Sequence, residues 1–163
     1  MRPRLFVSIL ALALLSSSAP AQERTYSYLD GKLGQVEVVV EAIPSHGDFV
    51  SVILGTRRGA VRVLCQAEQA ADWLTRARAL LASVTERAAP GETITTNARA
   101  CEQFGDDRSP VMNLVRRVRS RDSQWSIEFR DEGGINSGSG TVTAADVRRL
   151  LSAVDKARAK LAG

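Results

Sequence analysis

The sequence predicts an α+β domain, a two-layer sandwich in which two amphipathic helices cover one face of an antiparallel sheet. Several short segments alternate hydrophobic and polar residues between turn-forming residues, the pattern of half-buried strands. Two longer segments repeat apolar residues every three or four positions, as amphipathic helices do. Of the 163 residues, 44% are hydrophobic and 25% are charged. This composition is ordinary for a globular protein, and it excludes collagen-like, low-complexity and polytopic membrane classes.

Residues 1–21 have the layout of a secretory signal peptide. Two arginines precede an apolar run at 5–15, and the small residues Ala19-Pro20-Ala21 form an A-x-A cleavage site. The apolar run is much shorter than the roughly 20 residues that a membrane-spanning helix needs. We therefore expect residues 22–163 to form a single mature domain, secreted or periplasmic, with no membrane span after cleavage.

Residues 36–65 predict a three-stranded meander. The segment Val36 to Ile43 is largely β-branched, and the strands Phe49 to Leu54 and Ala60 to Cys65 follow it after turns that contain glycine. Short turns between consecutive strands imply antiparallel pairing. Tyr26 and Tyr28 precede the meander. They belong either to an edge strand or to an ordered tail.

Helical spacing begins directly after the meander. The stripe from Ala70 to Val84 includes Trp73, and Pro90 lies beyond its end. A second stripe runs from Val147 to Leu161, and the preceding Thr143 and Asp146 resemble a capping box. We expect both stripes, with Trp73 in the first and Leu151 in the second, to face the core.

The segment between the two helices contains a strand at Gln124 to Arg130, where every second residue is apolar. The Ser/Gly-rich segment 136–140 is interpreted as a flexible turn. The order of strand, turn, strand and helix is then the same in residues 49–84 and 124–161, which suggests an internal duplication.

The sequence contains two cysteines, Cys65 and Cys101. In an oxidising compartment such a pair most simply forms a disulfide. The alternatives are two unpaired thiols, or a catalytic or metal-binding role, which the spacing does not favour because redox pairs are more often C-x-x-C.

Removal of the leader leaves 20 basic and 18 acidic residues, a formal charge of +2. This weak field argues against a nucleic-acid partner.

The densest charge cluster is the run 116–121. As a strand it would place Arg117, Arg119 and Arg121 on one face, where guanidinium groups could bind phosphate, sulfate or carboxylate. The alternative is a solvated strand face without a ligand.

The sequence predicts no metal site and no cofactor, because it has a single histidine and no phosphate-binding or metal-ligand motif. We expect an exported, non-enzymatic binding module whose partner is an envelope protein or an anionic ligand. The alternative is a small secreted hydrolase that uses His46 with Glu37, Glu41 or Asp48. A third hypothesis is an assembly module whose sheet edge adds to the sheet of a partner.

Overall fold

The computed structural model of this protein describes residues 24–56, 59–83, 87–101 and 110–163. The leader predicted for residues 1–21 and Val84, the last residue of the first predicted helical stripe, lie outside these ranges. The first half contains β1 (Tyr26–Leu33), β2 (Val36–Ile43), β3 (Phe49–Thr56), β4 (Gly59–Gln66) and α1 (Ala67–Ala82). The second half contains β5 (Ile94–Ala100), β6 (Val111–Val118), β7 (Ser123–Arg130), β8 (Ser137–Val142) and α2 (Ala144–Leu161).

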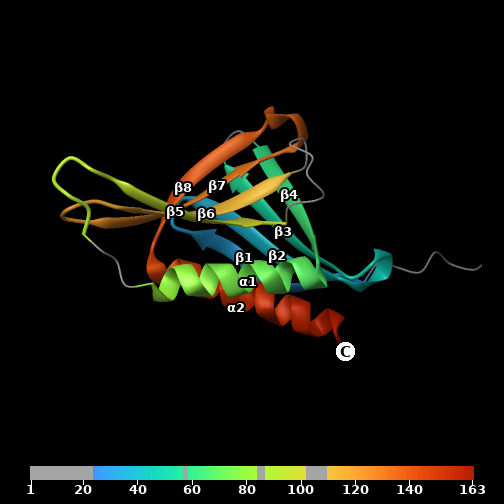
Figure 1. The fold of residues 1–163 in the computed structure, drawn as a ribbon. Coiled ribbons are helices and arrows are strands. Elements are labelled where there is room, and N and C mark those ends of the chain that lie inside the picture. Colours follow the sequence, from blue (N-terminus) through green and yellow to red (C-terminus); the bar gives the residue numbers. More distant parts are fainter. Residues whose placement is uncertain (1–23, 57–58, 84–86, 102–109) are drawn as a thin grey trace, which may run out of the picture.

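The strands form two antiparallel sheets, which together with the helices confirms the α+β class (Figure 1). Sheet 1 has the strand order β1-β2-β3-β4, and sheet 2 has the order β5-β6-β7-β8. The single sheet that the sequence predicts is therefore divided into two. The division follows α1, which takes the chain away from β4 before β5 begins, so that β5 pairs with β6.

The predicted meander is confirmed as β2, β3 and β4, and β1 adds to its edge with a bulge between Ser27 and Leu29.

The interpretation of residues 136–140 as a flexible turn is wrong, because Ser137–Val142 forms β8. Gly140 serves close packing there. A Cβ at Gly140 would overlap the side chain of Val36, so the absent side chain lets the two sheets approach each other.

The predicted capping box at the start of α2 is confirmed. The hydroxyl of Thr143 accepts a hydrogen bond from the backbone N–H of Asp146 at 3.1 Å. The carboxylate of Asp146 accepts the backbone N–H of Thr143 at 3.0 Å, which lowers the pKa of that carboxyl. Among the described residues, no helix is long and apolar enough to cross a membrane.

One hydrophobic core joins the two halves. The helix α2 follows sheet 2 along the chain but packs on β1, β2 and β3 of sheet 1. The helix α1 packs beside α2 and also against β5 of sheet 2 (Figure 1). Trp73 of α1 and Leu151 of α2 are 1% and 3% exposed, which confirms that both stripes face the core.

Two polar contacts fix α1 between its neighbours. The indole Nε1 of Trp73 donates to the backbone oxygen of Ala98 in β5 at 3.0 Å. The guanidinium of Arg78 donates to the carboxylate of Asp155 in α2 at 2.8 Å. This hydrogen bond is the main reason why the pKa of Asp155 lies below its ordinary value. The buried tryptophan and the pair at the surface together set the position of α1 relative to β5 and α2.

The predicted disulfide between Cys65 and Cys101 is present, and both residues are buried. Cys65 lies near the end of β4 and Cys101 directly follows β5, so the bond joins sheet 1 to sheet 2. A disulfide agrees with an oxidising compartment.

Replacing both cysteines by alanine should destabilise the domain. The disulfide closes a loop whose ends are 36 residues apart. A loop of this size corresponds to a loss of about 3 to 4 kcal/mol in the free energy of unfolding. Urea unfolding of the oxidised protein and the double variant measures the difference. A loss below about 1 kcal/mol would show that the disulfide does not constrain the fold.

A second prediction concerns Gly34, in the turn between β1 and β2. Its φ is +55°, and an added Cβ would overlap the backbone oxygen of Thr141 in β8, the same oxygen that accepts the N–H of Gln35 at 3.3 Å. We expect Gly34→Ala to cost about 2 to 4 kcal/mol of stability, because it combines backbone strain with a clash between the two sheets.

The matched control is Gly91→Ala, because Gly91 also has a positive φ but has open space around its Cβ position. This control should cost only about 1 kcal/mol, from backbone strain alone. Thermal unfolding followed by circular dichroism compares the two variants. Equal losses would mean that contact at Gly34 does not hold the sheets together.

Candidate functional site

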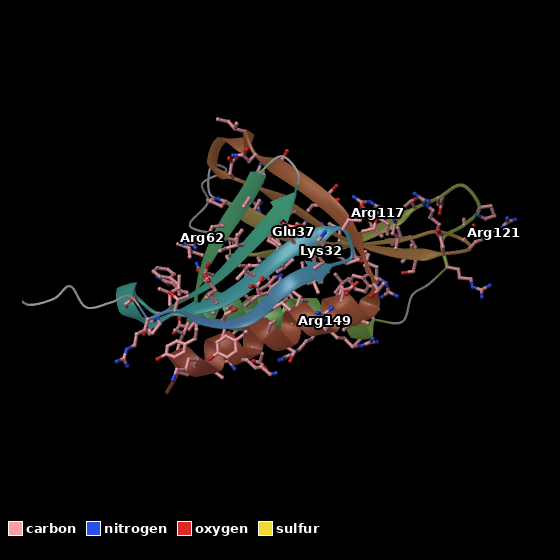
Figure 2. The ribbon with its side chains drawn as sticks, turned by 180° about the vertical axis from the view of Figure 1, so that it is seen from behind. Lys32, Glu37, Arg62, Arg117, Arg121 and Arg149 are labelled. Atoms are coloured by element: carbon pink, nitrogen blue, oxygen red, sulfur yellow. A yellow bond between two sulfur atoms is a disulfide. The ribbon has the colours of Figure 1, made fainter. Side chains whose placement is uncertain are left out.

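The structure does not place the three predicted arginines in one strand row. Arg117 lies in β6, which ends at Val118. The backbone N–H of Arg119 donates to the oxygen of Asp122 at 2.8 Å and closes the turn between β6 and β7. Arg119 and Arg121 therefore belong to this turn. Figure 2 shows Arg121 at the far tip of the molecule and Arg117 closer to its body.

Arg117 is held by side chains of β7. Its guanidinium donates to the hydroxyl of Ser126 at 2.9 Å and to the carboxylate of Glu128 at 2.5 Å. The side chains of Arg117 and Glu128 are 35% and 37% exposed, so the ion pair is only partly screened by water. The role of Arg117 in the structure is to neutralise Glu128.

The partners of Arg117 belong to the polar face of sheet 2, defined here as the side chains that point away from the hydrophobic core. The strand register places one row of this face across all four strands. The row consists of Arg99 on β5, Asn113 on β6, Glu128 on β7 and Ser139 on β8. Four polar side chains from four strands therefore lie side by side, although they are far apart in the sequence.

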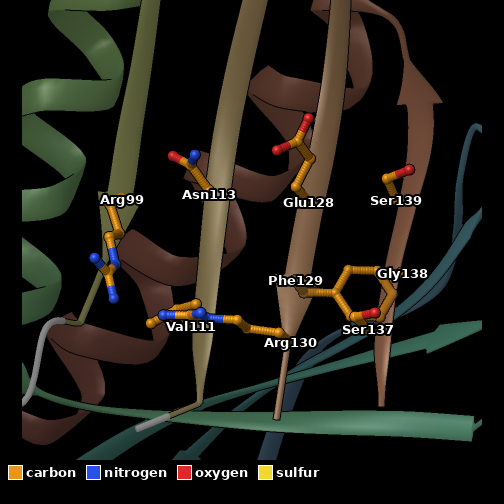
Figure 3. Close-up of a pocket in the computed structure, with 9 residues that line it drawn as sticks. All are labelled: Arg99, Val111, Asn113, Glu128, Phe129, Arg130, Ser137, Gly138 and Ser139. Atoms are coloured by element: carbon orange, nitrogen blue, oxygen red, sulfur yellow. The ribbon is translucent and has the colours of Figure 1, made fainter. Parts of the chain in front are cut away.

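A cavity of about 620 Å³ opens on this face (Figure 3). Besides the four residues of the row, its lining includes Val111, Phe129, Arg130, Ser137 and Gly138. In Figure 3 the side chains of Asn113 and Glu128 project from adjacent strands, and Arg130 extends below them toward Val111. The cavity is therefore a hollow on a rigid sheet, with hydrogen-bonding groups supplied by every strand.

The cavity has the donors that an oxyanion requires. Arg99 and Arg130 bring two positive charges, and Glu128, the one acidic residue among the described residues of the lining, is paired with Arg117. Both lining arginines also have further interactions within the chain. A guanidinium has five N–H donors, so an arginine that is oriented by one partner can still donate to a bound anion.

The cavity also offers an acceptor and hydroxyl groups. The side-chain oxygen Oδ1 of Asn113 is buried, and it has no hydrogen-bond partner within the described part of the chain. Ser137 and Ser139 line the opposite side and are exposed. A buried acceptor without a partner costs free energy, which a donor group on a ligand would recover.

The sequence gives little indication of this cavity. Arg99 and Asn113 flank residues 101–110, where no periodic pattern is visible, and the segment that contains Ser137 and Ser139 looks like a turn. The one available signal is the alternation of Gln124 to Arg130, which places Glu128 and Arg130 on the face opposite Trp125. Strand pairing is needed to join these residues to the others.

A second hollow of about 410 Å³ lies at the turn between β6 and β7. Its lining includes the two predicted ligand-binding residues of the turn, Arg119 and Arg121, together with Arg87 and Asp122. Arg87, Arg119 and Arg121 are exposed. The structure thus brings two of the three predicted arginines together, and adds a third from the segment that precedes β5.

The carboxylates of the hydrolase hypothesis lie on sheet 1. Glu37 pairs with Lys32 at 3.6 Å (Figure 2). Glu41 pairs with Arg62 at 3.8 Å. The two glutamates are four residues apart on β2, so their side chains lie on the same face of that strand, and each is paired with its own basic residue. Asp48 is exposed, and the side chain of His46 lies outside the described structure.

In the described part of the chain, no three His, Cys, Asp or Glu side chains are placed to hold a metal ion together. No protein-family model matches the sequence, and the curated proteins contain no significant match to it. The functional argument therefore depends on the geometry of the polar face and its cavity.

Proposed function

We propose that the chain is an exported, non-enzymatic binding module that takes an anionic, hydroxyl-bearing ligand in the cavity on the polar face of sheet 2. The observation that carries this proposal is the convergence of Arg99, Arg130, Asn113 and Ser139 from four adjacent strands on one hollow. Binding sites are typically concave and contain a few convergent polar groups that fix the orientation of the ligand.

The charges of the site favour a carboxylate or a sulfate. Glu128 forms an ion pair with Arg117, and Arg99 and Arg130 contribute two guanidinium groups to the same lining. Arginine binds planar oxyanions through paired hydrogen bonds, and such charge-assisted bonds are stronger than neutral ones. A ligand that places one acidic group between these arginines fits the electrostatics of the cavity.

The neutral groups favour hydroxyls on the same ligand. Asn113 presents an acceptor without a partner, and the hydroxyls of Ser137 and Ser139 can both donate and accept. An acidic sugar unit carries both a carboxylate and several hydroxyls. We therefore assign the site to an acidic saccharide, such as a unit of an anionic polymer outside the cytoplasm.

Export is part of the same proposal. Its support is the apolar leader that ends at Ala21 and the disulfide between Cys65 and Cys101, which is stable in an oxidising compartment. Amino-terminal sequencing of the protein recovered from the source cells tests it directly. The expected first residue is Gln22, and an intact Met1 would contradict export by cleavage.

We further propose that the two halves are copies of one unit of four strands and a helix. Both halves have this order, and the predicted repeats 49–84 and 124–161 each contain two paired strands and a helix. In this proposal the two sheets form the strand layer of the predicted sandwich, and the two helices form the other layer. Superposition of the halves in an experimental structure tests the proposal, and different helix placements would contradict it.

Binding of tetragalacturonate, an oligomer of a uronic acid, tests the assigned function. Isothermal titration calorimetry of the oxidised mature domain should show binding at about 20 mM salt that weakens at about 150 mM, because the contact is electrostatic. The neutral maltotetraose should not bind. Glu128→Gln should tighten binding about threefold, because it removes the negative charge from the cavity.

Ser139→Val should weaken binding of the same oligosaccharide about tenfold, because the added methyl groups occupy the cavity and a hydroxyl is lost. This position is exposed and in a strand, where valine is well tolerated. The matched control is Arg62→Gln on sheet 1, which removes a positive charge at a residue outside the cavity lining and should leave the affinity unchanged. Equal binding of the neutral sugar, or equal weakening by the control, would contradict the proposal.

A further inference from the structure

The outer edge of sheet 2 contains an open stretch of strand. The amino-terminal part of β5, Ile94 to Asn97, is exposed, whereas Ala98 and Ala100 are buried. In Figure 1 this part of β5 and the adjoining ends of β6 and β7 project beyond the ends of the two helices. We propose that this edge binds an extended segment of a partner protein as an added antiparallel strand, and that the segment carries acidic residues at its carboxyl end.

The direction of the backbone groups follows from the turn between β6 and β7. Arg119 and Asp122 form a hydrogen-bonded pair across this turn. In an antiparallel ladder, hydrogen-bonded pairs alternate with pairs that are not hydrogen-bonded. The pair Arg117 and Gln124 is therefore hydrogen-bonded, and Arg117 directs its N–H and C=O toward β7. The next residue, Arg116, directs its own groups to the other side, toward β5.

The same alternation fixes the direction of each residue of β5. Thr96 lies opposite Arg116, so the backbone groups of Thr96 bond with β6. Thr95 and Asn97 therefore direct their N–H and C=O groups away from the sheet. No hydrogen bond joins these groups to any described residue, and they provide four bonding positions for another strand.

The sequence of this edge does not protect it against strand addition. The stretch from Ile94 to Asn97 contains three β-branched residues and no charge or proline. Natural proteins usually block exposed edges with lysine, proline or a bulge. The register of β5 on β6 is continuous, so no bulge interrupts this strand. Ile94 is also one of the few large apolar residues that are well exposed, at 41%.

The charges near the edge identify the partner. Ile94 lies opposite Val118, and Val118 lines the hollow that contains Arg87, Arg119 and Arg121. A strand that runs antiparallel to β5 ends beside Ile94, so its carboxyl end meets these arginines. Among the described residues of the lining, Asp122 is the one acidic residue beside three arginines, so this described lining carries a net positive charge. Acidic residues at that end of the partner complement it.

The same charges disfavour a second copy of this chain as the added strand. Antiparallel pairing of two copies of β5 would bring the arginine-lined hollow of one copy toward Arg99 of the other. Like charges in close contact oppose association. An acidic partner segment avoids this repulsion, and the exposed edge can bind it without rearrangement of the sheet.

The test uses a labelled peptide of alternating threonine and valine that ends in two glutamates. Fluorescence anisotropy should show saturable binding to the mature domain, and a peptide that ends in two lysines should bind about tenfold more weakly or not at all. Amide hydrogen exchange followed by NMR should show slower exchange at Thr95 and Asn97 in the complex. Exchange at Thr96 should not change, because its N–H already bonds with β6.

The decisive variant is Thr95→Pro, which removes one outward N–H but leaves the bonds between β5 and β6 in place. It should weaken peptide binding at least about fivefold, while the control Thr95→Val, which keeps the N–H, should bind like the unmodified protein. Arg121→Ala should weaken binding of the acidic peptide and reduce its salt dependence. Should Thr95→Pro fail to fold, the exchange measurement on the unmodified protein decides the question alone.

Three results would overturn the proposal. The first is unchanged exchange at Thr95 and Asn97 when the peptide is saturating. The second is equal affinity of a folded Thr95→Pro variant and the unmodified protein. The third is dimerisation of the mature domain without peptide that Thr95→Pro abolishes, because this would assign the edge to a second copy. None of these measurements depends on the saccharide site.

Discussion

The two halves of the chain cover each other. Sheet 1 packs against α2, which comes from the second half, and β5 of sheet 2 packs against α1, which comes from the first. The side chains at these contacts are fully buried, among them Trp73, Leu74 and Leu150. Burial of each such side chain contributes about 1.5 to 3 kcal/mol. Because each half supplies cover for the other, neither sheet can hold its apolar face away from water alone.

This arrangement determines where a site can form. The helices and the buried disulfide act on the inner side of the sheets, and Gly34 contacts the backbone of the edge strand β8. The side chains on the polar face of sheet 2 do not contribute to the shared core. They are therefore available to contact a ligand. The cavity with Arg99 and Arg130 therefore stands on strands that are fixed from behind, which keeps its polar groups in place.

Much of the fold could be predicted because many segments bury only one side. Alternation identifies β2 and β7, and the spacing of apolar residues identifies both helices. The same rule fails at β5, where the first four residues are all exposed and give no alternation. It also fails to predict two sheets, because the sequence between β4 and β5 does not show which strand edges pair.

The candidate site was harder to predict than the fold. The arginines at 117, 119 and 121 alternate as in a strand, but the hydrogen bond between Arg119 and Asp122 turns the chain without glycine or proline to mark the position. Conversely, glycine in Ser137 to Gly140 suggests a turn, although Gly140 is required there by the close approach of Val36. The first error arises from a local turn that no turn-forming glycine or proline marks, and the second arises because a contact distant in sequence overrides local preference.

Separation of the two halves tests this mutual dependence most directly. Fragments 22–91 and 92–163, prepared with Cys65→Ala and Cys101→Ala, can be compared with the intact chain that carries the same two substitutions. Each fragment alone should show no cooperative thermal transition by circular dichroism, and an equimolar mixture should recover one. A cooperative transition of fragment 22–91 alone, at the melting temperature of the intact variant, would contradict the account.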